Sequence, residues 1–250
     1  MAWASVGTLG SVQSKTANQA SLVLTTSAAA EAENVVVLVV ATDNNQTTDG
    51  DEGAVTGISD SAGGNTWTKA IEFCNGQGGA QSGATVSVWF SKLTNQIASG
   101  GTITASFSNT ASRDATAATA WEFTIGAGNV VTVEATNTLA NDGAAPGSLD
   151  AATANAEFLR VRGIAGETDS ATQLSATASW TLLANNQTSG GAPTSNMAVR
   201  GEFRIFTGTG DASFPLFASV DNASAYAALK EAAPPAPGAH KGLHLLGVGH

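Results

Sequence analysis

The chain has 250 residues and a formal net charge of -10, with 10 Lys and Arg against 20 Asp and Glu. Charged residues make up 12% of the chain, about half of the usual share of roughly 25%. The few basic residues are scattered, so the chain lacks the positive patch of a nucleic-acid-binding protein. No apolar run approaches the ~18 residues that a membrane helix needs. Disorder is also unexpected, because disordered chains combine high charge with low hydrophobicity.

The start of the chain has neither a basic segment nor an apolar core segment, so we expect no secretory signal peptide. Ala, Thr, Gly and Ser together fill about half of the chain, a composition typical of extracellular proteins. The combination favours a protein that reaches the outside by cell lysis, as a component of a virus particle does. The other reading is a chain whose signal has already been removed.

Apolar runs, continuous or alternating with polar residues, predict β-strands almost throughout. The run at 35–40 is apolar on both faces, so we expect a strand buried on both sides. The strands are expected, in chain order, at 35–40, 83–93, 102–108, 120–125, 129–134, 157–164, 180–183, 197–206, 214–220 and 224–230. The last of these could also form a helical turn.

Gly- and Asn-rich turn signals separate the strands, and the run at 60–65 should connect two short strands. A spacing of roughly 8–15 residues between strands and turns is typical of a sandwich or barrel. The predicted fold is therefore an all-β, jelly-roll-like antiparallel β-sandwich with an extended C-terminal arm.

Three segments are expected along the chain. Residues 1–231 should form the sandwich, 232–238 a proline-rich linker that cannot join a central strand, and 239–250 a C-terminal docking arm. The arm would bury its apolar side chains on a neighbouring subunit, and a disordered end is the alternative. The partner-docking residues are Leu243, Leu245, Leu246 and Val248.

Catalytic and nucleotide-binding motifs are missing. There is no phosphate-binding Gly-rich loop with Lys, no dinucleotide fingerprint and no Gly-x-Ser-x-Gly elbow. All three histidines follow the proline-rich segment, which excludes a Ser-His-Asp site within the sandwich. We therefore expect a protein that is not an enzyme and carries no cofactor.

Metal sites have two weak candidates. The loop from Asp43 to Glu52 is rich in oxygen ligands that calcium prefers, although its spacing differs from an EF-hand and a solvated acidic loop is the simpler interpretation. His240 and His244 lie four residues apart, but flanking glycines disfavour the helix that would pair them.

Glu122 and Glu202 each lie in the middle of a predicted strand beside aromatic residues, as the acids of a β-sandwich glycosidase could. The simpler interpretation makes them outward residues that pair with arginines. In that case Arg200, Glu202 and Arg204 form a charge ladder on the surface, and Arg160 and Arg162 share a face in the same way.

Trp89 alternates out of phase with Val86, Val88 and Phe90, so it is the best candidate for an exposed ring that stacks on a sugar. Packing in the core is the competing interpretation for all five tryptophans. Cys74 is the single cysteine, which rules out an intrachain disulfide, and we expect it to be a small core residue.

The order of turn-plus-aromatic motifs is similar to that of a loose group of β-sandwich proteins from tailed-bacteriophage particles, namely head decoration or cement proteins and tail accessory proteins. The resemblance spans roughly residues 34 to 231. It implies a structural role in the particle and brings no catalytic residues. The motifs that carry it are the segments 60–68, 86–90, 100–108, 121–123, 179–181 and 199–204.

Three functions follow from these patterns. The first is a virion structural protein that forms a homo-oligomer and contacts other virion proteins through its C-terminal arm. The second is a carbohydrate-binding or adhesin module for host surface glycans, with Trp89 as its stacking residue. The third is a β-sandwich glycan hydrolase or lyase that uses Glu122 or Glu202.

Overall fold

A computed structural model describes residues 3–44, 46–76, 83–108, 113–142, 156–169, 179–208 and 221–234. Almost every element is a β-strand, as the sequence predicted, apart from a short 3-10 turn at Pro193–Ser195. No helix among these residues is long and apolar enough to cross a membrane. The strands are β1 (Ala4–Ser14), β2 (Ser21–Thr25), β3 (Val35–Asp43), β4 (Val55–Asp60), β5 (Thr68–Cys74), β6 (Ala84–Lys92), β7 (Thr102–Phe107), β8 (Thr116–Thr124), β9 (Val130–Asp142), β10 (Glu157–Gly166), β11 (Thr181–Leu182), β12 (Asn186–Gln187), β13 (Ala198–Thr207) and β14 (Asp221–Ala232).

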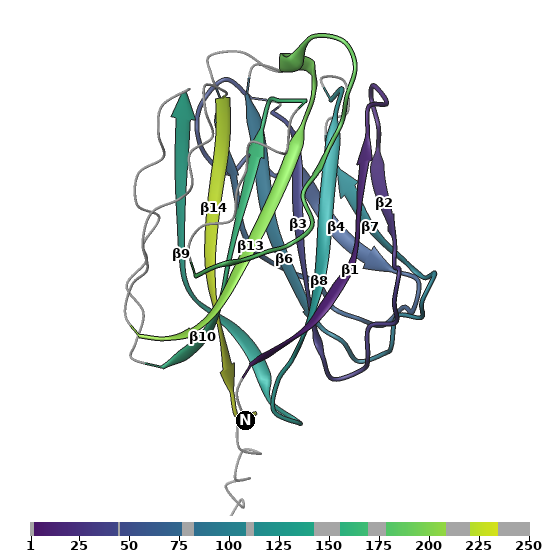
Figure 1. Cartoon of the computed structure of the whole chain (residues 1–250), viewed down its shortest axis with the longest axis vertical. Coiled ribbons are helices and arrows are strands. Elements are labelled where there is room, and N and C mark those ends of the chain that lie inside the picture. The colour runs from purple at the N-terminus through teal and green to yellow at the C-terminus, as the bar shows by residue number, and fades with distance from the viewer. Residues whose placement is uncertain are drawn as a thin grey trace, which may run out of the picture.

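The strands form three antiparallel sheets (Figure 1). The central sheet has the order β1-β8-β3-β6-β5, and the small sheet has the order β2-β7-β4. The outer sheet runs β11-β13-β10-β14-β9, and β12 also pairs with β13. The all-β sandwich predicted from the sequence is therefore present.

The first eight strands pair in a nested way. β1 pairs with β8, β2 with β7 and β3 with β6, while β4 and β5 join different sheets. Nested antiparallel pairs divided between two facing sheets are the pattern of a jelly roll. The jelly-roll-like strand order thus lies within the first half of the chain, and β9 to β14 add the outer sheet to it.

The central sheet has a hydrophobic core on each of its two faces. Val35, Val37 and Val39 of β3 pack toward the outer sheet, whereas Val36, Leu38 and Val40 pack toward the small sheet. All nine residues of β3 are buried, as the continuous apolar run predicted. This strand therefore lies in the middle of a three-layered structure.

The outer sheet approaches the central sheet closely. Gly163 of β10 lies opposite Val39 and Val86, where an added Cβ would come within 2.6 Å and 2.9 Å of their methyl groups. The alanines of β14 have the same effect, because small side chains allow two sheets to pack tightly. The segment at 224–230 lies wholly within β14, which extends from Asp221 to Ala232, so it does not form the helical turn considered as the alternative.

The turn expected at 60–65 connects β4 to β5. Its first residue, Asp60, accepts hydrogen bonds from the backbone N–H groups of Ala62 and Gly63 and from the indole of Trp67. Gly63 and Gly64 both have positive φ angles, of 68° and 74°, which suits glycine best. The Asp at the start and the two glycines thus explain why the chain turns here.

Candidate functional site

Trp89 is buried rather than exposed. Its side chain lies on the opposite face of β6 from Val88 and Phe90, as alternation predicted, but the small sheet covers that face. The residue is 7% exposed, and its indole N–H donates to Ser87. The expectation of an exposed stacking ring at this position is therefore wrong.

Glu122 and Glu202 lie in different layers. Glu122 of β8 accepts hydrogen bonds from the backbone N–H of Glu31 and the amide of Asn34. It belongs to the face of β8 that packs toward the small sheet, whereas Glu202 lies on the face of β13 that points away from the central sheet. The two carboxylates share no cleft, so they do not form the paired acids of a glycosidase.

Two members of the charge ladder expected on the surface, Arg200 and Glu202, are buried, whereas Arg204 is half-buried. Arg162 binds Glu202 with its Nε and Nη2 atoms at 2.8 Å and 2.7 Å, and Arg200 binds the other carboxylate oxygen. Arg162, Arg200 and Glu202 are each 2% exposed or less, which corrects the interpretation of Arg200 and Glu202 as outward surface residues. Glu202 pairs with arginines, as expected, but the pairing takes place inside the protein and not at its surface.

Aromatic side chains explain this burial. The guanidinium of Arg162 stacks on Trp180 at 3.8 Å, and Arg160, also fully buried, lies near the ring of Phe206 and the hydroxyl of Tyr226. Flat guanidinium groups pack well on aromatic faces. The outer face of the outer sheet is thus a mixed layer of aromatic and charged side chains.

The acidic loop from Asp43 to Glu52 does not gather its carboxylates around one point. Asp43 accepts two backbone hydrogen bonds, Asp49 accepts one from Gly76, and Asp51 pairs with Lys69. Among the described residues no group of three His, Cys, Asp or Glu side chains is placed to hold a metal ion. The loop carboxylates bind the surrounding backbone and side chains instead.

Three buried carboxyl groups hold protons more tightly than usual. Burial raises the pKa of Asp43 to about 6 and the pKa of Glu72 to about 7. Burial also raises the pKa of Glu167 to about 7, with the nearby charges of Asp221 and Asp43 adding to the effect. These groups therefore change charge close to neutral pH, and Asp43 and Glu167 lie near enough to influence each other.

Cys74 is buried, as expected. Burial, together with the nearby carboxylate of Glu52, raises the pKa of its thiol to about 12. The docking-arm residues Leu243, Leu245, Leu246 and Val248, and the two histidines His240 and His244, lie outside the described residues.

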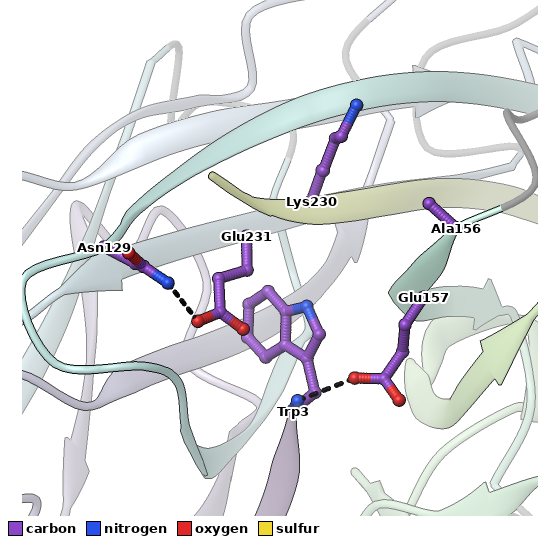
Figure 2. Close-up of a pocket in the computed structure, with 6 residues that line it drawn as sticks. All are labelled: Trp3, Asn129, Ala156, Glu157, Lys230 and Glu231. Atoms are coloured by element: carbon purple, nitrogen blue, oxygen red, sulfur yellow. Dashed lines mark hydrogen bonds between the residues drawn. The ribbon is translucent and has the colours of Figure 1, made fainter. Parts of the chain in front are cut away.

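A pocket lies where the start of the chain meets the end of β14 (Figure 2). The cavity has a volume of about 270 Å³. The pocket lies at one end of the outer sheet, where β9 and β10 begin and β14 ends. Its lining residues are Trp3, Asn129, Ala156, Glu157, Lys230 and Glu231.

Hydrogen bonds fix two of the pocket side chains. One carboxylate oxygen of Glu157 accepts the backbone N–H of Trp3 at 2.8 Å. One oxygen of Glu231 accepts the backbone N–H of Gly126 at 2.5 Å and the amide of Asn129. Figure 2 shows both carboxylates beside the indole of Trp3. The pocket thus combines an aromatic ring, two acids and one base.

Sequence reasoning missed this pocket because its residues come from distant parts of the chain. Trp3 and Glu157, which share a hydrogen bond, are 154 positions apart. No spacing motif connects them, so no pattern in the sequence indicated this pocket. No protein-family model, no curated protein and no solved structure matches the chain.

Proposed function

We propose that the chain is a structural component of a bacteriophage particle, either a head decoration protein or a tail accessory protein. The observation that carries the proposal is the nested pairing of β1 with β8, β2 with β7 and β3 with β6. Jelly rolls with this pairing are common in viral capsid proteins, although lectin domains use them as well. The sequence resemblance to phage particle proteins favours a role in the particle over a role as a lectin domain.

The three-layered body suits a rigid building block. Both faces of the central sheet are filled with apolar side chains, and the charged groups of the outer sheet are bound to one another. Such a body presents a fixed acidic surface, since the chain carries a net charge of -10. We infer that it acts through protein–protein contacts and not as a catalyst.

The contact would be made by the arm at 239–250 of one subunit on the body of the next. Burying Leu243, Leu245, Leu246 and Val248 would contribute several kcal/mol before ordering costs, at about 25 cal/mol per Å² of apolar area. The edge strands β1 and β2 are candidate docking surfaces, because Val6 and Val23 are exposed there by 53% and 46%. An extended segment can pair with such an edge.

Sedimentation of the full chain beside a chain that ends after Pro234 tests the proposal. The shorter chain keeps β14 and should remain a folded monomer, whereas the full chain should form oligomers. A second variant that carries Val6→Lys and Val23→Lys should keep the fold and weaken the oligomer. Equal sedimentation of the full and shortened chains, or absence of the protein from purified particles, would contradict the proposed role.

A further inference from the structure

The pocket beside Trp3 carries polar atoms that no described residue binds. The indole nitrogen of Trp3 is buried without a hydrogen-bond partner, and the residue is only 4% exposed. Glu157 and Glu231 each use one carboxylate oxygen for the protein, which leaves the second oxygen of each carboxylate without a partner among the described residues. One buried donor without a partner, and two carboxylates that each have an oxygen not bonded to a described residue, therefore line one cavity.

An indole N–H that is removed from water without an acceptor is costly, so most such groups in folded proteins find a partner. Figure 2 shows the indole nitrogen of Trp3 on the side of the ring that faces Lys230, Ala156 and Glu157. The cavity of about 270 Å³ is several times larger than the ~30 Å³ that one water molecule occupies. A small molecule is thus a natural partner for this donor.

We propose that this pocket binds one saccharide unit. A ligand here must accept hydrogen bonds from the Trp3 indole and donate them to Glu157 and Glu231. A hydroxyl group does both, whereas an ammonium group can only donate and a phosphate without protons can only accept. A ring with several hydroxyl groups therefore matches the donors and acceptors of the pocket.

The charges at the pocket also disfavour an anion. Glu157 and Glu231 place two carboxylates beside the single ammonium of Lys230, whose Nζ atom also lies 3.7 Å from a carboxylate oxygen of Glu134. The ammonium keeps hydrogen-bond donors for a ligand hydroxyl. Since drug-sized sites span roughly 300–1,000 Å³, this cavity fits a single sugar unit at the end of a glycan better than a long chain.

This site is independent of the proposed assembly role. It lies on the described body, between Trp3 and the end of β14, and needs no residue of the arm. A chain that ends after Pro234 should bind saccharide as the full chain does. Failure of the sugar site would leave the assembly role untouched, and the reverse also holds.

Titration of the full chain with the methyl glycosides of glucose, galactose, mannose and N-acetylglucosamine tests the proposal by NMR. The Trp3 indole N–H signal, identified by its loss in Trp3→Phe, should shift with at least one glycoside. Trp3→Phe keeps an aromatic ring against Phe123 but removes the donor, so it should weaken binding about fivefold or more. Glu231→Gln removes a charge while keeping the shape of the side chain, and it should also weaken binding.

Trp67→Phe is the matched control, because it also removes one indole N–H but lies at the turn beside Asp60, outside the pocket. Its affinity for the glycoside should equal that of the wild-type chain. The proposal is overturned if no glycoside shifts the Trp3 signal, or if Trp3→Phe and Glu231→Gln bind as tightly as the control. It is also overturned if only methylamine or inorganic phosphate, tested in the same way, shifts that signal.

Discussion

Replacing Glu167 with Gln should stabilise the protein at alkaline pH. Glu167 is 4% exposed, and one of its carboxylate oxygens has no hydrogen-bond partner. Its environment penalises the charged form, which is why burial raises its pKa from 4.5 to about 7. Gln has nearly the same shape and no charge, so the substitution removes that penalty.

The size of the effect follows from the pKa shift. One pKa unit corresponds to about 1.4 kcal/mol, so the shift from 4.5 to about 7 corresponds to roughly 3 kcal/mol. Because the folded-state pKa is raised, the penalty is fully present above about pH 7 and disappears as the pH falls below the unfolded-state value of 4.5. Glu167→Gln should therefore stabilise the protein at about pH 8 and change little near pH 4.5.

Urea unfolding followed by tryptophan fluorescence measures this. With a denaturant slope of about 3 kcal/mol per M, the midpoint at alkaline pH should rise by about 1 M. Glu33→Gln is a matched control, because Glu33 is an exposed acid paired with Lys92, and its midpoint should hardly move. A midpoint of Glu167→Gln that equals or falls below the wild-type value at alkaline pH would refute the reasoning.

Four further outcomes are expected. The free energy of unfolding of the wild-type chain should rise as the pH falls from about 8 to about 5, since Asp43 and Glu72 also have raised pKa values. A steady fall in the urea midpoint over the same change in pH would contradict this. Glu202→Gln should cost about 3–5 kcal/mol, because it leaves Arg162 and Arg200 without their shared carboxylate, and thermal unfolding at the wild-type temperature would disprove this. Gly163→Ala should cost roughly 1–3 kcal/mol from the clash with Val39, which calorimetry can check. Cys74 should react with Ellman's reagent only after unfolding, and rapid reaction of the native protein would show that the thiol is accessible.

The alternation of apolar residues predicted correctly which face of a strand each side chain lies on. It did not predict whether another sheet covers that face. It placed Val86, Val88 and Phe90 of β6 on one face, and they form part of the core toward the outer sheet. It placed Trp89 on the other face but could not reveal that the small sheet covers it. The same limit applies to Glu202, whose strand face was predicted correctly but whose carboxylate is buried against Arg162 and Arg200.

β1 was missed for a local reason. Gly7 and Gly10 interrupt its pattern, and the pairing with β8 shifts register between Ser5 and Gly7 and again between Thr8 and Gly10. Each bulge moves the following side chains to the opposite face, which destroys a simple alternation. β3 was found easily, because both of its faces are buried and its run of apolar residues has no interruption.

Cross-linking from the arm tests the assembly role most directly. A photoreactive amino acid at Leu245 in a mixture of unlabelled and isotopically labelled chains distinguishes contacts between subunits from contacts within one subunit. The proposed role predicts cross-links between differently labelled chains, in peptides from the edge strands β1 or β2. Cross-links confined to single chains would contradict it.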